Sequence, residues 1–411
     1  MINRAHEERL AEMLACFPVV AVIGARQVGK STLVQSPRVG AGRAYFTLDD
    51  LDVLCLAARD PKALLTQAKP VTIDEAQRRP DLLRVIKCEV DRNRAPGSFL
   101  LTGSSDLNFS AALARELAGR AGVLPLMPIS WREVNAQPNP PAWLKWLEAE
   151  TVADVEATVR DVRPAVAAGD ALFAGGYPPA VTAPTSAARR DWFAAYRHTY
   201  LERDVRQVAN IGNLPEYARL FQTVAARAGQ LLNLAALARD VGLPASTAAR
   251  YLSILEASFQ VVRLAPWFAN LGKRLVKTPK VYWSDTGLLA HLLGVETWDD
   301  AVAQGLSGAL FESFVLLELS KHIAVFDPAA RLHFVRSHSG LEVNALLVRG
   351  LRQLPVEIKS GMTIRVDDAE ALETYLRLVK AAKVGVVIYG GSECRRLSRR
   401  VLAVPVTALL V

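Results

Sequence analysis

The chain has 411 residues, of which 51% are hydrophobic, and a formal net charge of +8. This length exceeds what one hydrophobic core usually serves, so roughly two to four domains are expected. No apolar run approaches the roughly 18 residues that a membrane helix needs. The start, MINRAHEERL, predicts a charged helix rather than a signal peptide. We therefore expect a globular, cytoplasmic protein with no membrane partner.

The cysteines and the excess positive charge say less about function. The four cysteines form no CxxC pair, so neither a zinc site nor a disulfide framework is predicted. The net charge is compatible with an anionic partner such as nucleic acid. Part of that charge lies in one cluster, Arg395, Arg396, Arg399 and Arg400. Clusters of this kind are usually a solvated face.

A phosphate-binding loop is predicted near the N-terminus. The stretch VVAVIGARQVGKST, Val19 to Thr32, fits the pattern GxxxxGK[ST] after an apolar strand and before a helix. Its glycines let backbone N–H groups close around phosphate oxygens, Lys30 offers a charge to the outer phosphates, and the Ser31 hydroxyl is a ligand for Mg²⁺. The helix N-terminus adds a partial positive charge. The predicted nucleotide-binding residues are Gly24, Ala25, Arg26, Gln27, Val28, Gly29, Lys30, Ser31 and Thr32.

The second half of the site is predicted at the end of a later strand. Strands are expected over residues 44–48 and 70–75, joined by a helical connection over 52–67. The second strand, PVTIDE, ends in Asp74 and Glu75. In a P-loop NTPase, Asp74 would hold Mg²⁺ through water, and Glu75 would orient or activate the attacking water. The interval after Lys30 leaves room for one extra strand, as in the P-loop branch with an additional catalytic glutamate. ATP hydrolysis with Mg²⁺ is therefore predicted, with Lys30 and Glu75 as catalytic residues.

Further contacts to the phosphates are expected from a fourth apolar run, SFLLTGSS. Parallel strands deliver their carboxyl ends to one edge of the sheet, so Thr102, Ser104 or Ser105 would sense the γ-phosphate. A Ser-rich turn is the alternative. A helix over 111–118 and a strand over 122–126 follow, with Arg120 between them. Arg120 would reach a phosphate of its own or a neighbouring subunit, or simply lie on the surface.

Strings along nearly the whole chain point to one family. The first third contains GARQVGKST, TIDEAQ, LTGSS and LAGR with PLMPISWRE, and later strings are GGYPPAV, YRHTYLERDVRQ, GQLLNLAALARDVG and KTPKVYWSDTGLLAHLLG. Together they resemble the AAA-type ATPases of bacteria and archaea that carry a C-terminal DUF4143 domain. The resemblance supports ATP and Mg²⁺ as cofactors and leaves the biological role open.

The expected fold is α/β with four parts. Residues 1–135 form a P-loop AAA-type ATPase domain with a parallel sheet and helices, and 136–215 a helical linker region. Residues 216–295 form a winged helix-turn-helix, and 296–411 a restriction-endonuclease-like α/β domain, DUF4143. A homo-oligomer that completes its site across a subunit interface is compatible with this arrangement.

The middle of the chain offers a candidate DNA contact. A helix over 189–210 carries arginines beside Glu202 and Asp204, where ion pairs are expected first and a trans-acting Arg203 second. Helices over 234–240 and from Ser246, a turn at Gly242 and a strand over 260–264 predict the winged helix. Its second helix would present Ser246, Thr247 and Arg250 to double-stranded DNA, or the module would be a lid or protein contact. The basic residues Lys273, Arg274, Lys277 and Lys280 would suit a phosphate backbone or a solvated loop.

The last hundred residues hold a second candidate chemistry. A helix over 308–322 is followed by strands over 332–336, 341–348 and 354–359, a helix over 366–379 and a strand over 384–389. This order resembles the restriction-endonuclease-like fold, whose PD-(D/E)xK site holds Mg²⁺ and activates water. Its matching residues are Glu312, Glu342, Asn344, Glu357 and Lys359.

One departure from that pattern weakens the nuclease hypothesis. Asn344 stands where the family's metal-binding aspartate is expected, which removes a charge that Mg²⁺ affinity depends on. Glu342 faces the same way on a strand and would substitute, with help from Glu312. A domain retained for binding or assembly is favoured over an active nuclease. The functions to be weighed are thus an ATPase coupled to an unknown partner such as DNA, a nucleotide-gated switch with little turnover, and a nuclease.

Overall fold

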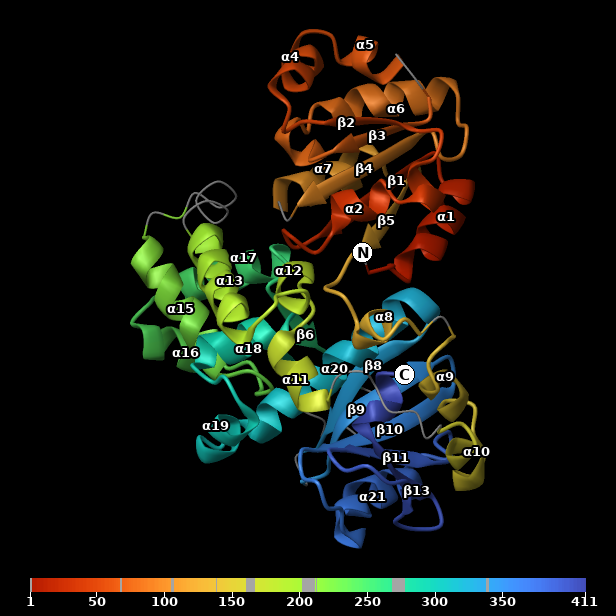
Figure 1. Ribbon diagram of the computed structural model, residues 1–411, viewed down its shortest axis with the longest axis vertical. Coiled ribbons are helices and arrows are strands. Elements are labelled where there is room, and N and C mark those ends of the chain that lie inside the picture. The colour runs from red at the N-terminus through yellow and green to blue at the C-terminus, as the bar shows by residue number, and fades with distance from the viewer. Residues whose placement is uncertain are drawn as a thin grey trace.

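The computed structural model describes residues 2–66, 69–104, 107–137, 139–159, 167–201, 211, 213–267, 278–337 and 340–411. Figure 1 shows an N-terminal sheet domain at the top, a helical region at the left and a C-terminal sheet domain below. Among the described helices, none is both long and apolar enough to cross a membrane.

The N-terminal domain is built on a parallel sheet. Its strands are β1 (Val19–Gly24), β2 (Ala44–Thr47), β3 (Val71–Asp74), β4 (Phe99–Ser104) and β5 (Ala121–Pro125). Their order is β2-β3-β4-β1-β5, and every neighbouring pair is parallel. Strands β1, β3 and β4 are buried almost throughout, as expected for a parallel sheet covered on both faces.

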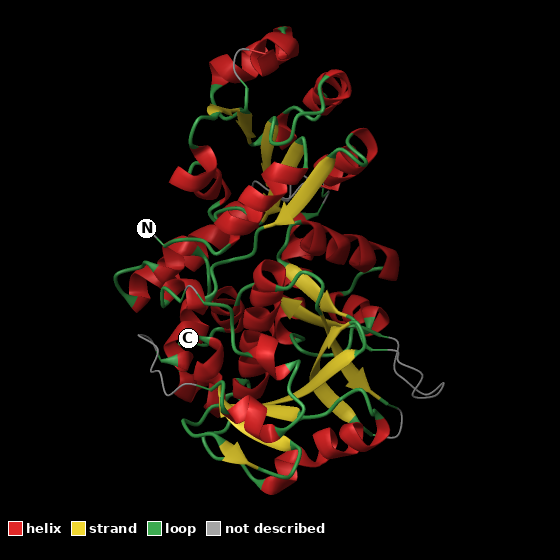
Figure 2. Ribbon diagram, turned by 90° about the vertical axis from the view of Figure 1, so that its right-hand side faces the viewer, coloured by secondary structure: helices red, strands yellow, loops and turns green. Residues whose placement is uncertain are grey.

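Helices flank this sheet on both sides (Figure 2). They are α1 (His6–Cys16), α2 (Lys30–Val34), α3 (Pro37–Gly40), α4 (Leu51–Arg59), α5 (Pro61–Thr66), α6 (Leu82–Arg92), α7 (Leu107–Glu116) and the 3-10 turn η1 (Ala76–Arg78). The elements predicted for this domain are therefore present, with α4 and α5 as two helices where one helical connection was expected.

The strand order places the candidate motifs together. The extra strand expected between the motifs exists as β2, but it lies at the edge of the sheet. The strand that separates β1 from β3 is β4, with Leu101 in register with both Ala21 and Ile73. Because all five strands run the same way, the carboxyl ends of β1, β3 and β4 meet at one edge.

The helical region follows in the middle of the chain. Its elements are α11 (Ala168–Ala174), α12 (Pro178–Val181), α13 (Ser186–Thr199), α15 (Leu214–Ala226), α16 (Leu234–Val241), α17 (Ala245–Ala257), β6 (Val261–Leu264), β7 (Lys280–Trp283), α18 (Thr286–Leu293) and α19 (Trp298–Ala303). Helix α16 is followed by Gly242, whose φ of 70° gives the left-handed turn that leads toward α17. Strand β6 pairs antiparallel with β7. The two helices, turn and strand predicted for the winged helix thus occur in the expected order.

Some predicted features of this region cannot be placed. The helix expected to reach residue 210 is described as α13, which ends at Thr199. Glu202, Arg203 and Asp204 lie outside the described residues, as do Lys273, Arg274 and Lys277.

The C-terminal domain is a mixed sheet with helices. It contains α20 (Ser307–Phe326), β8 (Arg331–Arg336), β9 (Glu342–Arg349), β10 (Arg352–Lys359), η3 (Val366–Ala369), α21 (Glu370–Leu378), β11 (Gly385–Tyr389), β12 (Arg395–Arg396), β13 (Val401–Pro405) and η4 (Val406–Leu409). The strand order is β12-β13-β11-β10-β9-β8. Strands β10, β11 and β13 are mutually parallel, and the other pairs are antiparallel.

Three short helices that precede the helical region belong spatially with this C-terminal sheet (Figure 1). They are α8 (Trp131–Val134), α9 (Trp143–Trp146) and α10 (Val152–Glu156). Arg396 bonds Glu156 at 3.0 Å, and Asn135 donates to the Leu410 carbonyl at 3.0 Å. Glu148 also pairs with Arg349. The segment 131–159, assigned from sequence to the nucleotide domain and the linker, therefore packs on the C-terminal domain.

Candidate nucleotide-binding site

The loop between β1 and α2 has the backbone that its glycines predict. A Cβ atom at Gly24 would lie 2.3 Å from the Leu126 carbonyl oxygen, so only glycine fits there. Gly29 has φ +93°, a conformation that other residues rarely adopt. The buried Lys30 ammonium donates to the Gly24 carbonyl at 3.1 Å and to the Ala25 carbonyl at 2.8 Å. The loop and its lysine thus form a compact unit at the start of α2.

Asp74 lies directly across from Ser31. The Ser31 hydroxyl donates to Asp74 Oδ2 at 3.0 Å, and the Tyr45 hydroxyl donates to the same oxygen at 2.7 Å. Thr102 bonds Asp74 Oδ1. Burial, together with the hydrogen bond to Asp74, raises the pKa of the Tyr45 hydroxyl above its ordinary value, so Tyr45 stays a donor. A carboxylate and a hydroxyl oxygen side by side are the hard ligands that Mg²⁺ prefers, so this pair fits that ion.

Glu75 is held by two neighbouring polar side chains. Its φ of 56° is left-handed, and its backbone N–H donates to Thr102 Oγ1 at 3.0 Å. The carboxylate accepts from the Gln77 amide and, at 3.4 Å, from the Ser104 hydroxyl. Gln77 also donates to Ser104 Oγ at 2.8 Å. Thr102 and Ser104 lie at the predicted edge, whereas Ser105 lies outside the described residues. Tyr45 was not predicted because no motif marks it, and Gln77 belongs to the string TIDEAQ but was given no role.

Arg120 is separated from this edge within the chain. It precedes β5, and the start of a parallel strand lies at the edge opposite its carboxyl end. There its guanidinium pairs with Asp91, with 2.6 Å between Nε and Oδ1. The hypothesis that Arg120 reaches a phosphate of its own subunit therefore disagrees with the structure, and a role toward a neighbouring subunit stays a prediction.

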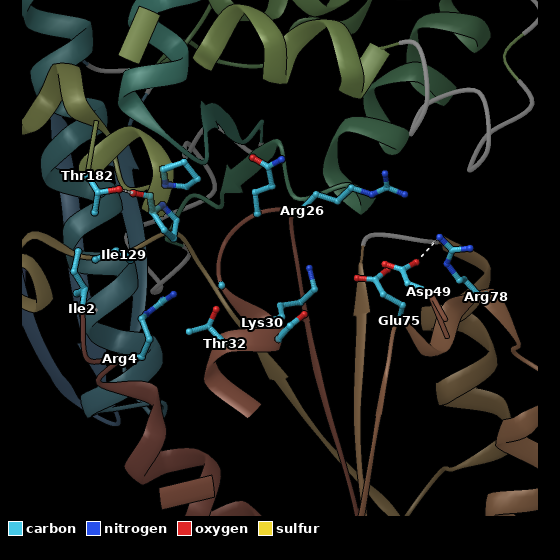
Figure 3. A pocket seen from close by; sticks show the side chains of 15 residues that line it. Ile2, Arg4, Arg26, Lys30, Thr32, Asp49, Glu75, Arg78, Ile129 and Thr182 are labelled. Carbon is cyan, nitrogen blue, oxygen red and sulfur yellow. Dashed lines mark hydrogen bonds and ion pairs between the residues drawn. The ribbon is translucent and has the colours of Figure 1, made fainter. Parts of the chain in front are cut away.

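The loop opens onto a cavity of about 820 Å³ shared between two parts of the chain (Figure 3). Lys30, Ser31 and Thr32 face it from α2, and Glu75, Asp49 and Arg78 lie on the far side, where Asp49 and Arg78 form an ion pair. The remaining lining residues come from the N-terminal segment, the loop, the stretch after β5 and α12: Ile2, Arg4, Arg26, Gln27, Gly29, Ile129, Pro178, Pro179 and Thr182. Part of the wall thus comes from the helical region, which the sequence did not reveal.

Arg4 fixes the loop from behind. It pairs with Glu133 at 3.0 Å and donates to the carbonyls of Val28 at 2.7 Å and Met127 at 2.8 Å. Burial opposes ionisation of Glu133, but the Arg4 charge and backbone N–H donors outweigh it and lower its pKa to about 2. The N-terminal segment, the loop and α8 are therefore joined by one buried charged group.

Comparison with known proteins agrees with this geometry. Residues 17–135 match a family model described as an AAA domain, and 307–409 match the domain of unknown function DUF4143. Residues 167–299 match a further domain of unknown function, DUF8612. The "Uncharacterized protein Mb2031c" of Mycobacterium bovis and the "Uncharacterized protein Rv2008c" of Mycobacterium tuberculosis are each 32% identical over 407 residues. Each match covers 98% of this chain and 83% of the relative.

The chain belongs to the family of AAA-domain proteins with a C-terminal DUF4143 domain. Among solved structures, "The walker-type atpase paby2304 of pyrococcus abyssi" is 16% identical with a TM-score of 0.40, covering 71% of this chain and 96% of that one. Protein VC1899 from Vibrio cholerae is 12% identical with a TM-score of 0.20, covering 96% and 95%.

In the DUF4143 domain, a lysine ammonium lies within the nuclease-like residues. Lys280 Nζ lies 3.1 Å from Glu312 Oε1 and 3.1 Å from Glu342 Oε1. Asn344 donates to Glu312 Oε2 at 3.0 Å and accepts from the Ile358 N–H at 2.9 Å. Lys280 is 3% exposed, so the expectation that it belongs to a solvent-facing basic stretch is wrong.

The other two nuclease-like residues pair with each other. Lys359 Nζ lies 3.3 Å from Glu357 Oε1 and 3.7 Å from Asp368 Oδ1. Burial raises the pKa of Glu357 to about 7, although Lys359 opposes the rise. Among the described residues, no group of three or more His, Cys, Asp or Glu side chains is arranged to hold a metal ion. The Lys280 ammonium thus compensates Glu312 and Glu342, the two acids that would stand in for the missing aspartate.

Proposed function

We propose that this protein binds ATP with Mg²⁺ and hydrolyses it. The observation that carries the proposal is the 3.0 Å hydrogen bond between Ser31 and Asp74, which joins the P-loop to the carboxyl end of β3. Beside this bond, Glu75 is held toward the same cavity by Gln77 and Ser104. A metal-ligand pair next to a fixed carboxylate is the arrangement that phosphoryl transfer to water requires.

Each residue has a distinct part in this proposal. Lys30 and the loop N–H groups bind the β- and γ-phosphates at the positive end of α2. Ser31 and Asp74 would hold Mg²⁺, which neutralises charge on the phosphate oxygens. Glu75 orients the attacking water and accepts its proton, while Gln77 and Ser104 keep the carboxylate in place. Thr102 orients Asp74 and the Glu75 backbone.

The cavity wall suggests how hydrolysis is coupled to the rest of the chain. A nucleotide in this cavity would contact Pro178 of α12 and Thr182 directly after this helix, as well as the P-loop. We infer that nucleotide binding alters the position of the helical region relative to the AAA domain. A partner would respond to this change. One candidate partner is double-stranded DNA bound at α16 and α17, and the other is a second copy of the chain that brings its Arg120 to the site.

The test is ATP turnover by the purified full chain with Mg²⁺, with and without DNA. Lys30→Ala removes the phosphate-binding charge, and Glu75→Gln keeps the shape but removes the base. We expect both to lower turnover by roughly 10²- to 10⁴-fold. Glu370→Gln, an exposed carboxylate of the DUF4143 domain, is the matched control and should turn over like wild type.

The rival readings give different results in the same assay. If Glu75→Gln matched wild type while Lys30→Ala lost ATP binding, the protein would be a nucleotide-gated switch with little turnover. Metal-dependent DNA cutting that disappeared with Lys359→Ala would reinstate the nuclease. Either result would overturn the proposed hydrolysis mechanism or the reading of the DUF4143 domain.

A further inference from the structure

A hollow of about 600 Å³ in the DUF4143 domain gathers positive charge. We call it the basic hollow. Its charged lining residues are Arg377, Lys380, Lys383, Arg399 and Arg400, opposed by the single acid Glu150, and Thr151, Leu376 and Val384 complete its wall. We propose that the basic hollow binds the phosphate backbone of double-stranded nucleic acid.

Arg400 has a structural part in the hollow. Helix α21 ends beside it, and the unsatisfied carbonyls of a helix end carry partial negative charge. Arg400 donates to the Leu376 carbonyl at 2.8 Å, the Ala382 carbonyl at 2.7 Å and the Lys383 carbonyl at 3.0 Å. These bonds fix the loop after α21 and compensate the partial negative charge at the end of this helix. The other cations of the hollow are therefore not neutralised by the helix end.

The other four cations are exposed and available. Arg377 donates to the Thr374 hydroxyl at 2.9 Å, which leaves its charge uncompensated. Lys380, Lys383 and Arg399 are exposed, and no described carboxylate lies within ion-pair distance of them. Arg377 lies in the last turn of α21, Lys380 and Lys383 in the loop before β11, and Arg399 in the loop before β13, and all four line one concavity. Convergence on a hollow distinguishes them from lysines scattered over a surface, because clefts of one charge focus the field.

The lining favours a phosphate backbone over an acidic protein. Protein interfaces have an apolar centre, whereas the two apolar residues of this wall, Leu376 and Val384, are buried in the domain. Phosphates need only exposed Lys and Arg side chains, which supply most of the affinity of non-specific nucleic-acid binding. The hollow therefore has the chemistry of a backbone contact without that of a protein interface.

The predicted recognition helix α17 is less suited to this task. Arg250 is its one exposed basic side chain, and its guanidinium lies over the Tyr251 ring at 5.2 Å. Two nearby basic residues are neutralised, because Arg227 pairs with Asp240 and Arg263 pairs with Glu256, and Arg239 of α16 adds one further exposed charge. On charge alone, the basic hollow is the stronger site for a polyanion.

The test is fluorescence anisotropy with a labelled DNA duplex of about two helical turns and the full chain without nucleotide. Lys380→Gln/Lys383→Gln removes two charges from the hollow. Arg59→Gln/Lys62→Gln removes two exposed charges from the AAA domain and is the matched control. Arg250→Gln tests α17. Thermal unfolding of each variant checks that the domains stay folded.

We expect the hollow variant to lose roughly 10- to 100-fold in affinity near about 0.1 M salt, and its log–log salt slope to fall by about 2. The matched control should change by no more than about twofold, as non-contacting charges are screened. Equal losses in the hollow and control variants, or a loss confined to Arg250→Gln, would overturn the assignment. So would a wild-type protein that binds poly-glutamate but no duplex. Because nucleotide is omitted, none of these results bears on the proposed hydrolysis.

Discussion

Replacing Lys280 with Met tests the reading of the DUF4143 domain as a retained scaffold. The Lys280 ammonium is 3.1 Å from carboxylate oxygens of both Glu312 and Glu342, and its side chain is 4% exposed. Met fills similar space but leaves Glu312 without a cation, whereas Glu342 keeps its ion pair with Arg336 at 3.5 Å. The side chain of Glu312 is only 17% exposed, so its charge would be poorly compensated by water.

The expected loss is about 3 kcal/mol in the free energy of unfolding. Removing one partner of a buried ion pair costs roughly 3–5 kcal/mol, and we take the lower end because the Glu342 side chain is 38% exposed. Asn344 and Tyr282 also still donate to Glu312. Urea unfolding followed by tryptophan fluorescence measures the change, and the buried Trp283 on the same strand is a local probe.

A double variant separates the charge from the packing. Lys280→Met/Glu312→Gln removes both charges of the more buried pair, so it should be more stable than Lys280→Met alone. A matched Lys359→Met variant should cost about 1 kcal/mol or less, because Glu357, whose pKa is already raised to about 7, takes up a proton once Lys359 is removed. The reasoning is refuted if Lys280→Met costs no more than Lys359→Met, or if the added Glu312→Gln gives no recovery.

Three further variants probe single groups. Folded Glu357 holds its proton up to about pH 7 against an ordinary pKa of 4.5, so wild type loses stability as pH rises through that window. In urea unfolding, Glu357→Gln should therefore raise the free energy of unfolding by up to roughly 3 kcal/mol at pH 8 and leave it unchanged at pH 4. An equal increase at both pH values would contradict this prediction. Burial lowers the pKa of His6 from 6.5 to about 4, so the unfolded chain takes up the proton first as pH falls. Between pH 7 and pH 4, the Tm of His6→Leu should therefore fall less than the Tm of wild type. Parallel curves of Tm against pH for the two proteins would contradict this prediction. Gln77→Ala should lower kcat roughly tenfold with KM unchanged, because it frees the Glu75 carboxylate; a change in KM alone would show a binding role.

The P-loop and the β3 carboxylates were predictable because their chemistry is local. A P-loop is one short turn that a few consecutive residues specify, Gly29 and Lys30 among them, and its backbone is suited to phosphate. Asp74 and Glu75 follow an apolar strand, and a strand end in an α/β sheet is a known place for a site. The regular elements of the DUF4143 sheet were also predictable, since alternating or continuous apolar runs mark strands.

Residues that act through distant partners were not predictable. Arg4 and Glu133 are 129 positions apart, and nothing in either local sequence marks the pair. Lys280 looked like part of a basic loop, yet it is buried between two acids from α20 and β9. Arg120 looked close to the site in sequence, but strand direction places it at the opposite edge.

The sequence by itself determined the P-loop, the strands and the family, and it predicted Ser31 and Asp74 as a metal-binding pair. Only the tertiary structure decided that β4 separates β1 from β3, that α12 forms a wall of the nucleotide cavity, and that an ammonium compensates the nuclease-like acids. The physical reason is the distance along the chain between the residues that interact. A turn or a strand is specified by neighbours along the chain, whereas ion pairs and cavity walls are made by side chains that meet only after the domains have packed.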